Sequence, residues 1–355
     1  MADIASARSS LQVCDLSQRF GTIQALSHVT LEVREDELLV VLGPTGAGKT
    51  TLLRIIAGLQ APDTGRVVMG GDDVTHATPS ARDVALVFQN FSLYPRWTVR
   101  KNLEFPLRAP GRNLPPDEIR SRVEWAADLL KITGHLDREA VRLSGGEMQR
   151  VAIGRAIVRC PRVFLMDEPL SNLDAKLREA LRVELVELRR ALRTPMVFVT
   201  HDQVEALSMA DRIAVLSGGR ILQLGTPKEI YESPASLEAA VQLGQPAINR
   251  IRVRRVDGWW IAQDGTPILK SESVAGGDEM LLGVRPENIE PTGGTHEGRV
   301  HIVVDLGATR VLLVHWAGSE FHITTDRTGE FKPGDMIRPR LRHQSAIFWP
   351  ASAAP

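Results

Sequence analysis

The segment from residue 43 to residue 50 constrains the fold of this chain more than any other. It reads Gly43-Pro44-Thr45-Gly46-Ala47-Gly48-Lys49-Thr50 and satisfies the pattern GxxxxGK[ST]. An apolar run, Leu38 to Leu42, precedes it and a helical pattern from Lys49 to about Ala57 follows, so the segment joins a strand to a helix. Glycines let backbone amides turn toward phosphate groups, and a helix presents its positive end to them. The pattern predicts a phosphate-binding loop in which Lys49 contacts the β and γ phosphates and the Thr50 hydroxyl ligates Mg²⁺.

Two adjacent acids, Asp167 and Glu168, follow the apolar run Val163 to Met166. This places them at the C-terminal end of a buried strand, the edge at which open α/β sheets bind ligands. Two acids at a strand end often mark only a solvated terminus, but the phosphate-binding loop upstream gives this pair a chemical partner. We expect Asp167 to hold Mg²⁺ through water, and Glu168 to act as general base or to orient an attacking water.

The length and the pattern of elements indicate two domains. A chain of 355 residues exceeds the roughly 100 to 200 residues of a typical domain. From about residue 11 to 235, short β-branched runs alternate with helical patterns, as in α/β layers with a largely parallel sheet, and one long amphipathic helix is predicted over Asn172 to Leu192. From about residue 245 onward, short strands such as Asn249 to Val256 recur between Gly, Pro and Asp turns, which indicates a small β-barrel.

The balance of charge argues against a general attraction to nucleic acid or to anionic membranes. Lys and Arg total 43, as do Asp and Glu, so any phosphate must be held locally. No apolar run approaches the roughly 18 residues needed to cross a bilayer, and residues 1–10 lack the features of a secretory signal, so a cytosolic location is expected. Cys14 and Cys160 lie far apart beside apolar residues, which fits reduced thiols.

A phosphate loop with an acidic strand leaves kinases, GTPases, helicases and recombinases open, and the segment Leu143 to Arg150 excludes most of these classes. It reads L-S-G-G-E-M-Q-R and precedes the acidic strand. Here the chain resembles the ATP-binding-cassette ATPases, whose signature LSGGQ opens a helix at this place. The resemblance implies an ATPase that uses ATP and Mg²⁺, with an α/β P-loop domain that contains a helical signature subdomain at about residues 90–155.

Four further motifs of that family occur in order. Phe20 precedes Gly21 where the family places an aromatic that stacks on adenine, Gln89 lies in V-F-Q-N like the Q-loop glutamine, and His201 lies in V-T-H-D like the switch histidine. Ser171-Asn172-Leu173-Asp174 matches the D-loop. Each of these residues alone would usually be a core or solvated side chain, so the ordered combination is what identifies them.

The resemblance implies a complete site. Its catalytic residues are Glu168, His201 and Gln89, and its Mg²⁺ ligands are Thr50, Gln89 and Asp167. The nucleotide is held by Phe20, Gly43, Pro44, Thr45, Gly46, Ala47, Gly48, Lys49, Thr50, Thr51, Ser144, Gly145, Gly146, Glu147 and Asp174. His201 is expected to contact the γ-phosphate and to hold the water near Glu168.

The resemblance also implies a homodimer. Ser144, Gly145 and Gly146 form a helix start suited to anions, and in the family this start faces the γ-phosphate bound by a second, head-to-tail subunit. ATP then bridges the two subunits, and hydrolysis removes the bridge. Glu147 stands where the family usually has Gln. Its carboxylate either points inward, where it could weaken nucleotide binding, or faces the solvent.

Further stretches resemble importer ATPases of the carbohydrate type, such as those for maltose or glycerol 3-phosphate. They are Leu93 to Val99, Asp202 to Ala206, Gly225 to Pro227 and Leu282 to Glu287. The resemblance implies an ATP-binding domain over residues 11–240 and a small all-β, OB-like regulatory or dimerisation domain over residues 245–355. It also implies two transmembrane permease subunits, an indirect periplasmic or lipoprotein solute-binding partner, and a peripheral position on the inner face of the cell membrane. A groove near Gln89 to Trp97 is expected to receive a short permease helix.

Other functions stay open as alternatives. Importers of polyamines or inorganic ions carry similar C-terminal domains. A more distant alternative is a soluble ATPase acting on nucleic acid, because Arg250, Arg252 and Arg254 alternate with apolar residues and OB barrels often bind nucleic acid. Any half-solvated strand shows the same alternation, and the zero net charge provides no wider basic field. We therefore expect no nucleic-acid partner.

Overall fold

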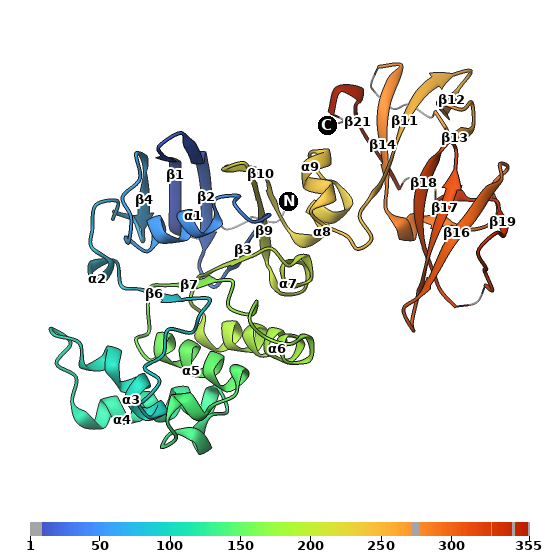
Figure 1. Ribbon diagram of the computed structural model, residues 1–355. Coiled ribbons are helices and arrows are strands. Elements are labelled where there is room, and N and C mark those ends of the chain that lie inside the picture. Colours follow the sequence, from blue (N-terminus) through green and yellow to red (C-terminus); the bar gives the residue numbers. More distant parts are fainter. Residues whose placement is uncertain (1–8, 272–276, 328, 343–344, 354–355) are drawn as a thin grey trace, which may run out of the picture. The chain divides into compact units, whose positions relative to one another are not determined.

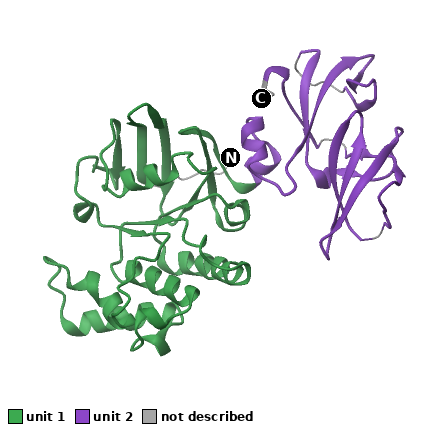
Figure 2. Ribbon diagram, in the orientation of Figure 1, with its two compact units in different colours: residues 1–227 green, residues 228–355 purple. Residues whose placement is uncertain are grey.

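The computed structural model describes residues 9–271, 277–327, 329–342 and 345–353. The chain divides into two compact units, residues 1–227 and 228–355 (Figure 2). Helices α8 (Pro227–Glu232) and α9 (Leu237–Val241) thus fall with the C-terminal unit, whereas the sequence placed residues up to 240 with the first domain. The physical reason is a long-range contact, because the buried guanidinium of Arg285 donates hydrogen bonds to the carbonyl oxygens of Tyr231 and Ala240.

The first unit is built on a six-stranded sheet in the order β10-β9-β3-β8-β7-β6 (Figure 1). The strands are β3 (Leu38–Leu42), β6 (Val84–Val87), β7 (Val163–Asp167), β8 (Met196–Thr200), β9 (Arg212–Ser217) and β10 (Arg220–Gly225). All except β10 run parallel, and β3 and β8 are buried throughout, as the apolar runs predicted. The C-terminal ends of β3, β7 and β8 therefore meet at one edge, where the segments that follow them come together.

A second, antiparallel sheet in the order β2-β1-β4-β5 packs into the same core. Its strands are β1 (Ser9–Phe20), β2 (Ile23–Arg34), β4 (Thr64–Met69) and β5 (Asp72–Asp73). One buried cluster joins Leu11 and Val13 of β1 to Val41 of β3 and to Leu52 of helix α1 (Lys49–Ile56). The start of α1 is thus anchored on both sides by apolar packing.

The other helices of the first unit are α2 (Pro79–Arg82), α3 (Val99–Glu104), α4 (Pro116–Leu129), α5 (Gly145–Ile157), α6 (Ala175–Leu192) and α7 (Gln203–Met209). Helices α3, α4 and α5 lie between β6 and β7 in the chain and form the predicted helical part. Helix α6 begins at Ala175, so the helix predicted from Asn172 was too long at its start. The reason is Asp174, whose carboxylate accepts a hydrogen bond from the Leu177 amide (3.0 Å) and caps the helix.

The second unit is mostly strand. Its sheets have the orders β13-β12-β11-β14-β21, β18-β17-β16-β19 and β15-β20. The strands are β11 (Asn249–Val256), β12 (Trp259–Ala262), β13 (Pro267–Lys270), β14 (Glu279–Val284), β15 (Ile289–Glu290), β16 (Gly298–Asp305), β17 (Arg310–Trp316), β18 (Ser319–Thr325), β19 (Met336–Ile337), β20 (Arg340–Leu341) and β21 (Ala346–Pro350). A shared core of buried residues, among them Trp260, Leu282 and Phe321, joins the two larger sheets. In the part of the chain that the structure describes, no helix is long and apolar enough to cross a membrane.

Candidate functional site

The loop between β3 and α1 owes its shape to glycines. Gly46 and Gly48 have φ angles of 82° and 104°, a backbone region that favours glycine. A Cβ atom on Gly48 would collide with the carbonyl oxygen of Ala25, and one on Gly43 with that of Leu216. The chain therefore turns tightly into the first turn of α1, whose amides have no partners within the helix and suit an anion.

Lys49 is held over this loop by the loop's own backbone. Its side chain is 5% exposed, and Nζ donates hydrogen bonds to the carbonyl oxygens of Gly43 (2.9 Å) and Pro44 (3.0 Å). The remaining close neighbour is charged, since Glu168 Oε1 lies 3.5 Å from Nζ. The ammonium thus lies between the loop and the acidic end of β7, with the partners that a buried charge requires.

The end of β7 brings both predicted carboxylates to the loop. Thr50 Oγ1 donates a hydrogen bond to Asp167 Oδ1 (3.1 Å). Burial raises the pKa of the Asp167 carboxyl, and the hydrogen bond from Thr50 opposes that rise. Glu168 has a left-handed φ of 44°, uncommon for a residue with a side chain, and its amide donates to the carbonyl oxygen of Val199 (3.0 Å). As a result, the two adjacent carboxylates have different partners: Asp167 contacts Thr50, whereas Glu168 lies beside Lys49.

His201 follows β8 directly and contacts the second oxygen of Glu168. Its Nδ1 atom lies 3.0 Å from Glu168 Oε2. Because an ionised carboxylate only accepts hydrogen bonds, we assign the proton to Nδ1. Glu168 therefore has Lys49 at one oxygen and His201 at the other, and the direction of its carboxylate is fixed by both.

Gln89 is connected to Glu168 through Ser171. Gln89 Nε2 donates to Ser171 Oγ (3.1 Å), and Ser171 Oγ donates to the main-chain oxygen of Glu168 (2.8 Å). Asn172 Nδ2 adds a hydrogen bond to the main-chain oxygen of Gln89 (2.8 Å). The sequence singled out Asp174 from this motif, but Ser171 and Asn172 make these contacts while Asp174 caps α6.

Phe20 lies at the end of β1, as the last residue before the turn to β2. It is 49% exposed, and its cross-strand partner Ile23 is exposed as well. An open aromatic face of this kind is what stacking on a planar ring requires.

The signature residues lie at the start of α5. Among the described residues, no hydrogen bond or ion pair joins this start to the loop at residues 43–50. Glu147 Oε2 accepts hydrogen bonds from the Ser144 amide (2.8 Å) and hydroxyl (3.0 Å), so the carboxylate folds back on its own helix. Its Oε1 lies 3.1 Å from His135 Nε2. The pattern S-x-x-E in the sequence was a sufficient signal for this capping box, but nothing in the sequence pointed to His135.

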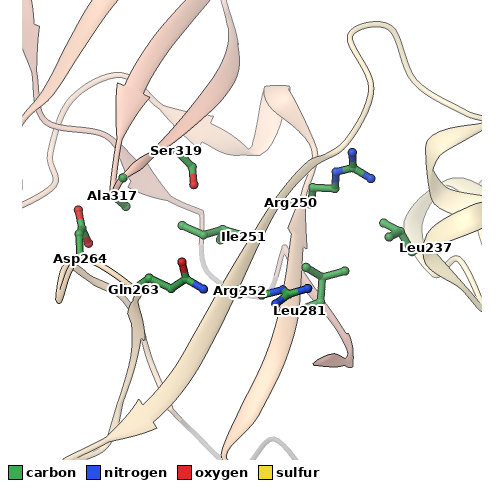
Figure 3. Close-up of a pocket in the computed structure, with 10 residues that line it drawn as sticks. Leu237, Arg250, Ile251, Arg252, Gln263, Asp264, Leu281, Ala317 and Ser319 are labelled. Carbon is green, nitrogen blue, oxygen red and sulfur yellow. The ribbon is translucent and has the colours of Figure 1, made fainter. Parts of the chain in front are cut away.

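A separate pocket of about 650 Å³ lies in the second unit (Figure 3). Its lining includes Arg250 and Arg252 of β11, residues of two turns, Gln263–Asp264 and Ala317–Gly318, and Ser319 at the start of β18. The two arginines are exposed while Ile251 between them is buried, which is the alternation expected of a half-solvated strand. No residue predicted to hold the nucleotide lines this pocket.

Two family models match the chain. The model described as ABC transporter matches residues 26–171, a range that contains the phosphate loop, the signature and the acidic strand. The model described as TOBE domain matches residues 282–349 in the second unit.

Proteins similar over most of the chain share one description. An sn-glycerol-3-phosphate import ATP-binding protein of Ruegeria pomeroyi is 42% identical and covers 90% of this chain and 91% of its own length. A protein of the same description from Rhizobium meliloti is 47% identical, with 82% and 81% covered. A xylose/arabinose import ATP-binding protein of Haloferax volcanii is 46% identical, with 79% and 74% covered.

Solved structures agree with these matches over about two thirds of the chain. The ADP conformation of MJ1267, an ATP-binding cassette of an ABC transporter, has a TM-score of 0.59 at 26% identity and covers 65% of this chain and 98% of that one. The cbiO1 protein of Clostridium perfringens, part of the transporter complex cbiONQ, has a TM-score of 0.58 at 28% identity, with 62% and 90% covered.

Proposed function

This chain belongs to the ABC transporter family as one of its ATP-binding ATPases, and on that premise we propose that it powers an importer of sugars or sugar derivatives. Relatives described as importers of glycerol 3-phosphate and of xylose or arabinose support the substrate class. The permease it serves spans the membrane, and this subunit lies against the permease on the cytoplasmic face.

The observation that carries the proposal is the convergence of Lys49, Glu168 and His201 at one edge of the sheet. Glu168 lies 3.5 Å from the ammonium and 3.0 Å from the imidazole. In the proposed reaction, Lys49 exchanges its contacts with the loop carbonyls for oxygens of the β and γ phosphates. Glu168 takes a proton from the attacking water, and His201 holds that water and the γ-phosphate in line.

The oxygen atoms at the end of β7 fit Mg²⁺. Thr50 Oγ1 and Asp167 Oδ1 lie 3.1 Å apart, and hydroxyl and carboxylate oxygens are ligands that this ion prefers. Gln89 directs its amide nitrogen to Ser171, which leaves its amide oxygen for the ion. Thr50 and Gln89 would hold Mg²⁺ directly and Asp167 through water. When bound, the ion neutralises charge on the phosphates.

A second copy of the chain completes the site. The amides of Gly145 and Gly146 lie in the first turn of α5 and have no partners within that helix. Because no described contact brings this helix start to the chain's own phosphate loop, its proposed ligand is the γ-phosphate bound by the other copy. The catalytic unit is then a homodimer with two ATP molecules between its subunits.

An aromatic cluster formed by Tyr94, Trp97 and Phe105 is the proposed docking surface for the permease. Tyr94 and Trp97 are 37% and 38% exposed, and their rings stack with centroids 4.4 Å apart. Phe105 packs edge-on against both rings. Arg155 braces the segment through hydrogen bonds to the main-chain oxygens of Phe91 (3.2 Å) and Ser92 (2.6 Å). Aromatic residues that are rigid yet half exposed suit an interface with a short helix.

The test is reconstitution of the chain with its permease subunits in proteoliposomes. ATP inside the vesicles should drive uptake of a sugar or of glycerol 3-phosphate delivered by the binding protein. Replacing Tyr94 or Trp97 by Ala should lower uptake at least about 10-fold and spare basal hydrolysis by the isolated subunit, because neither residue belongs to the phosphate site.

Trp125→Ala is the matched control, since Trp125 is an equally exposed tryptophan on α4 outside the cluster. It should leave uptake unchanged. Normal uptake in both cluster variants would exclude the docking role. Copurification of RNA or DNA in place of hydrophobic subunits would contradict the importer function as a whole, and uptake of a polyamine or an inorganic ion alone would contradict the substrate class.

A further inference from the structure

Glu147 holds the start of α5 through a network of hydrogen bonds. Its Oε2 accepts from the amide (2.8 Å) and the hydroxyl (3.0 Å) of Ser144. In return, the Glu147 amide donates to Ser144 Oγ (3.4 Å), which closes a capping box. The hydrogen bond from the Ser144 amide holds the pKa of the Glu147 carboxyl below its usual range, so this group is an anion at neutral pH.

His135 is a matched donor for the other carboxylate oxygen. It ends the 3₁₀ turn Thr133–His135, and its Nε2 lies 3.1 Å from Glu147 Oε1. Its Nδ1 is buried and has no hydrogen-bond partner among the described residues. A proton on Nδ1 would therefore be an orphan donor, so we assign the proton to Nε2, where the carboxylate accepts it.

The capping box uses both donors of Ser144. The hydroxyl has a single proton, and it is directed to Glu147 Oε2 together with the amide proton. A phosphate that reaches this helix start can take the amides of Gly145 and Gly146 directly. It can take the Ser144 hydroxyl only after Glu147 releases it, and it must approach a carboxylate of its own sign.

We propose that Glu147 is an internal anion that competes with the γ-phosphate of the second subunit for Ser144. This inference rests on the proposed function, because that phosphate arrives only when two copies close around ATP. Before closure the carboxylate occupies the positive end of α5 in place of the phosphate. At closure it gives up Ser144 while His135 keeps its other oxygen. Glu147 is thus a positioning residue that raises the ATP concentration needed for closure.

The experiment compares Glu147→Gln with the native chain in the assembled importer. The amide oxygen of Gln still accepts from Ser144, so the cap persists while the charge is removed. The ATP concentration that gives half-maximal hydrolysis should fall about 3- to 10-fold, the difference between a charge-assisted and a neutral hydrogen bond. The rate at saturating ATP should change by less than about 2-fold, because the residues that react with water are untouched.

Two comparisons separate this role from a merely structural one. Glu118→Gln removes a carboxylate from the first turn of α4, where it pairs with Arg122 (2.7 Å), and should leave the ATP dependence unchanged. His135→Leu should raise the half-maximal ATP concentration in the native chain, because the carboxylate loses its other donor. In the Glu147→Gln background the same change should have a smaller effect.

An unchanged ATP dependence for Glu147→Gln, in an importer whose native form transports, overturns this inference. Equal shifts for Glu118→Gln and Glu147→Gln overturn it as well, since the effect would then be general to helix starts. Equal effects of His135→Leu in both backgrounds overturn the pairing with His135. A native complex without ATP-driven uptake overturns the proposed function instead, so the two failures are distinguishable.

Discussion

Two buried cations, one taken from each unit of this chain, have different partners. Lys49 in the first unit is 5% exposed and Arg285 in the second unit is 2% exposed. Lys49 bonds to two loop carbonyls and lies 3.5 Å from the carboxylate of Glu168. Arg285 forms no ion pair within the described residues. It donates to the carbonyl oxygens of Tyr231 (3.0 Å), Ala240 (3.1 Å) and Leu243, and its guanidinium lies 4.1 Å from the centre of the Tyr231 ring.

The comparison teaches what separates a functional buried charge from a structural one. The ammonium of Lys49 is a compact charge whose loop partners can be exchanged for phosphate oxygens. The planar guanidinium of Arg285 donates to carbonyls at the end of α9, and moving it would break these buried hydrogen bonds. Burial lowers the pKa of Arg285. A buried cation beside a carboxylate and a glycine loop is therefore a candidate for ligand binding or catalysis. A buried cation whose partners are carbonyls at a helix end serves to stabilise the fold.

The largest effect is expected for the carboxylate that faces Lys49. Glu168→Gln keeps the packing but cannot accept a proton, so turnover should fall about 10²- to 10⁴-fold. ATP binding should stay intact, since Lys49 and the loop are unchanged. Phosphate release and ATP titration of the purified transporter measure the two quantities. Turnover at the native rate would exclude Glu168 as the base.

The next effect concerns Lys49 itself. Lys49→Ala removes the charge that the phosphates need, and ATP affinity should weaken about 100-fold. The second unit should keep its native unfolding transition, because Lys49 and the loop that holds it belong to the first unit. Calorimetric ATP titration and thermal unfolding measure both quantities. An ATP affinity equal to that of the native chain would contradict the assignment of Lys49 to nucleotide binding, which is what distinguishes it from Arg285.

The cation of the second unit should give the opposite result. Arg285→Met removes buried hydrogen bonds to three main-chain carbonyl oxygens and should lower the free energy of unfolding of that unit by about 3 kcal/mol. ATP affinity should not change. Arg252→Met is the control, because the exposed Arg252 should contribute less than about 0.5 kcal/mol. Equal destabilisation by the two substitutions, measured by denaturant unfolding, would refute the structural role of Arg285.

Two truncations test whether residues 228–240 fold with the first unit or with the second. A chain ending at residue 227 should fold and bind ATP, because the phosphate loop, acidic strand and switch histidine all precede that point. A chain ending at residue 240 should bind ATP equally well. It should, however, expose Ile230 and Leu237, which are buried in the full chain, and lose its extra residues to proteases. Protection of residues 228–240 from limited proteolysis would move the boundary back to the position that the sequence suggested.

The smallest effect concerns Tyr231, the ring beneath Arg285. Burial raises the pKa of Tyr231 to about 12, and a hydrogen bond from its hydroxyl to Glu287 (2.6 Å) contributes to the shift. The folded chain therefore keeps a proton that the unfolded chain loses near pH 10, so this contribution to stability is complete below about pH 10 and is lost between about pH 10 and 12. Discounted for partial exposure, it amounts to about 1 kcal/mol.

Tyr231→Phe should remove this pH-dependent loss. The sequence contains only one other tyrosine, Tyr94, so Tyr94→Phe leaves a single phenol whose ionisation can be followed by absorbance. Titration of that phenol near pH 10 in the folded chain would contradict the contact with Glu287.

The sequence predicted the phosphate loop and the acidic strand end because neighbouring residues determine them. A glycine loop between a buried strand and a helix, and acids directly after a strand, need no information from distant parts of the chain. The boundary near residue 227 could not be predicted in this way. Helices α8 and α9 have ordinary helical patterns, and the contacts that join them to the rest of the second unit come from distant residues. Among these are Arg285, 45 residues beyond Ala240, and the buried Leu281 and Trp349. The direction of Glu147 depends in the same way on His135, which lies in a separate turn.

Two consecutive hydrogen bonds through the Ser171 hydroxyl connect Gln89 to the main chain of Glu168, and the single hydroxyl proton fixes the direction of both. Its one proton goes to the Glu168 carbonyl, so toward Gln89 it can only accept. If Gln89 turns its amide away, Ser171 loses the incoming bond but keeps the outgoing one, and the strained turn at Glu168 stays in place. The main-chain contact that Ser171 makes with Glu168 therefore does not depend on the position of the Gln89 amide.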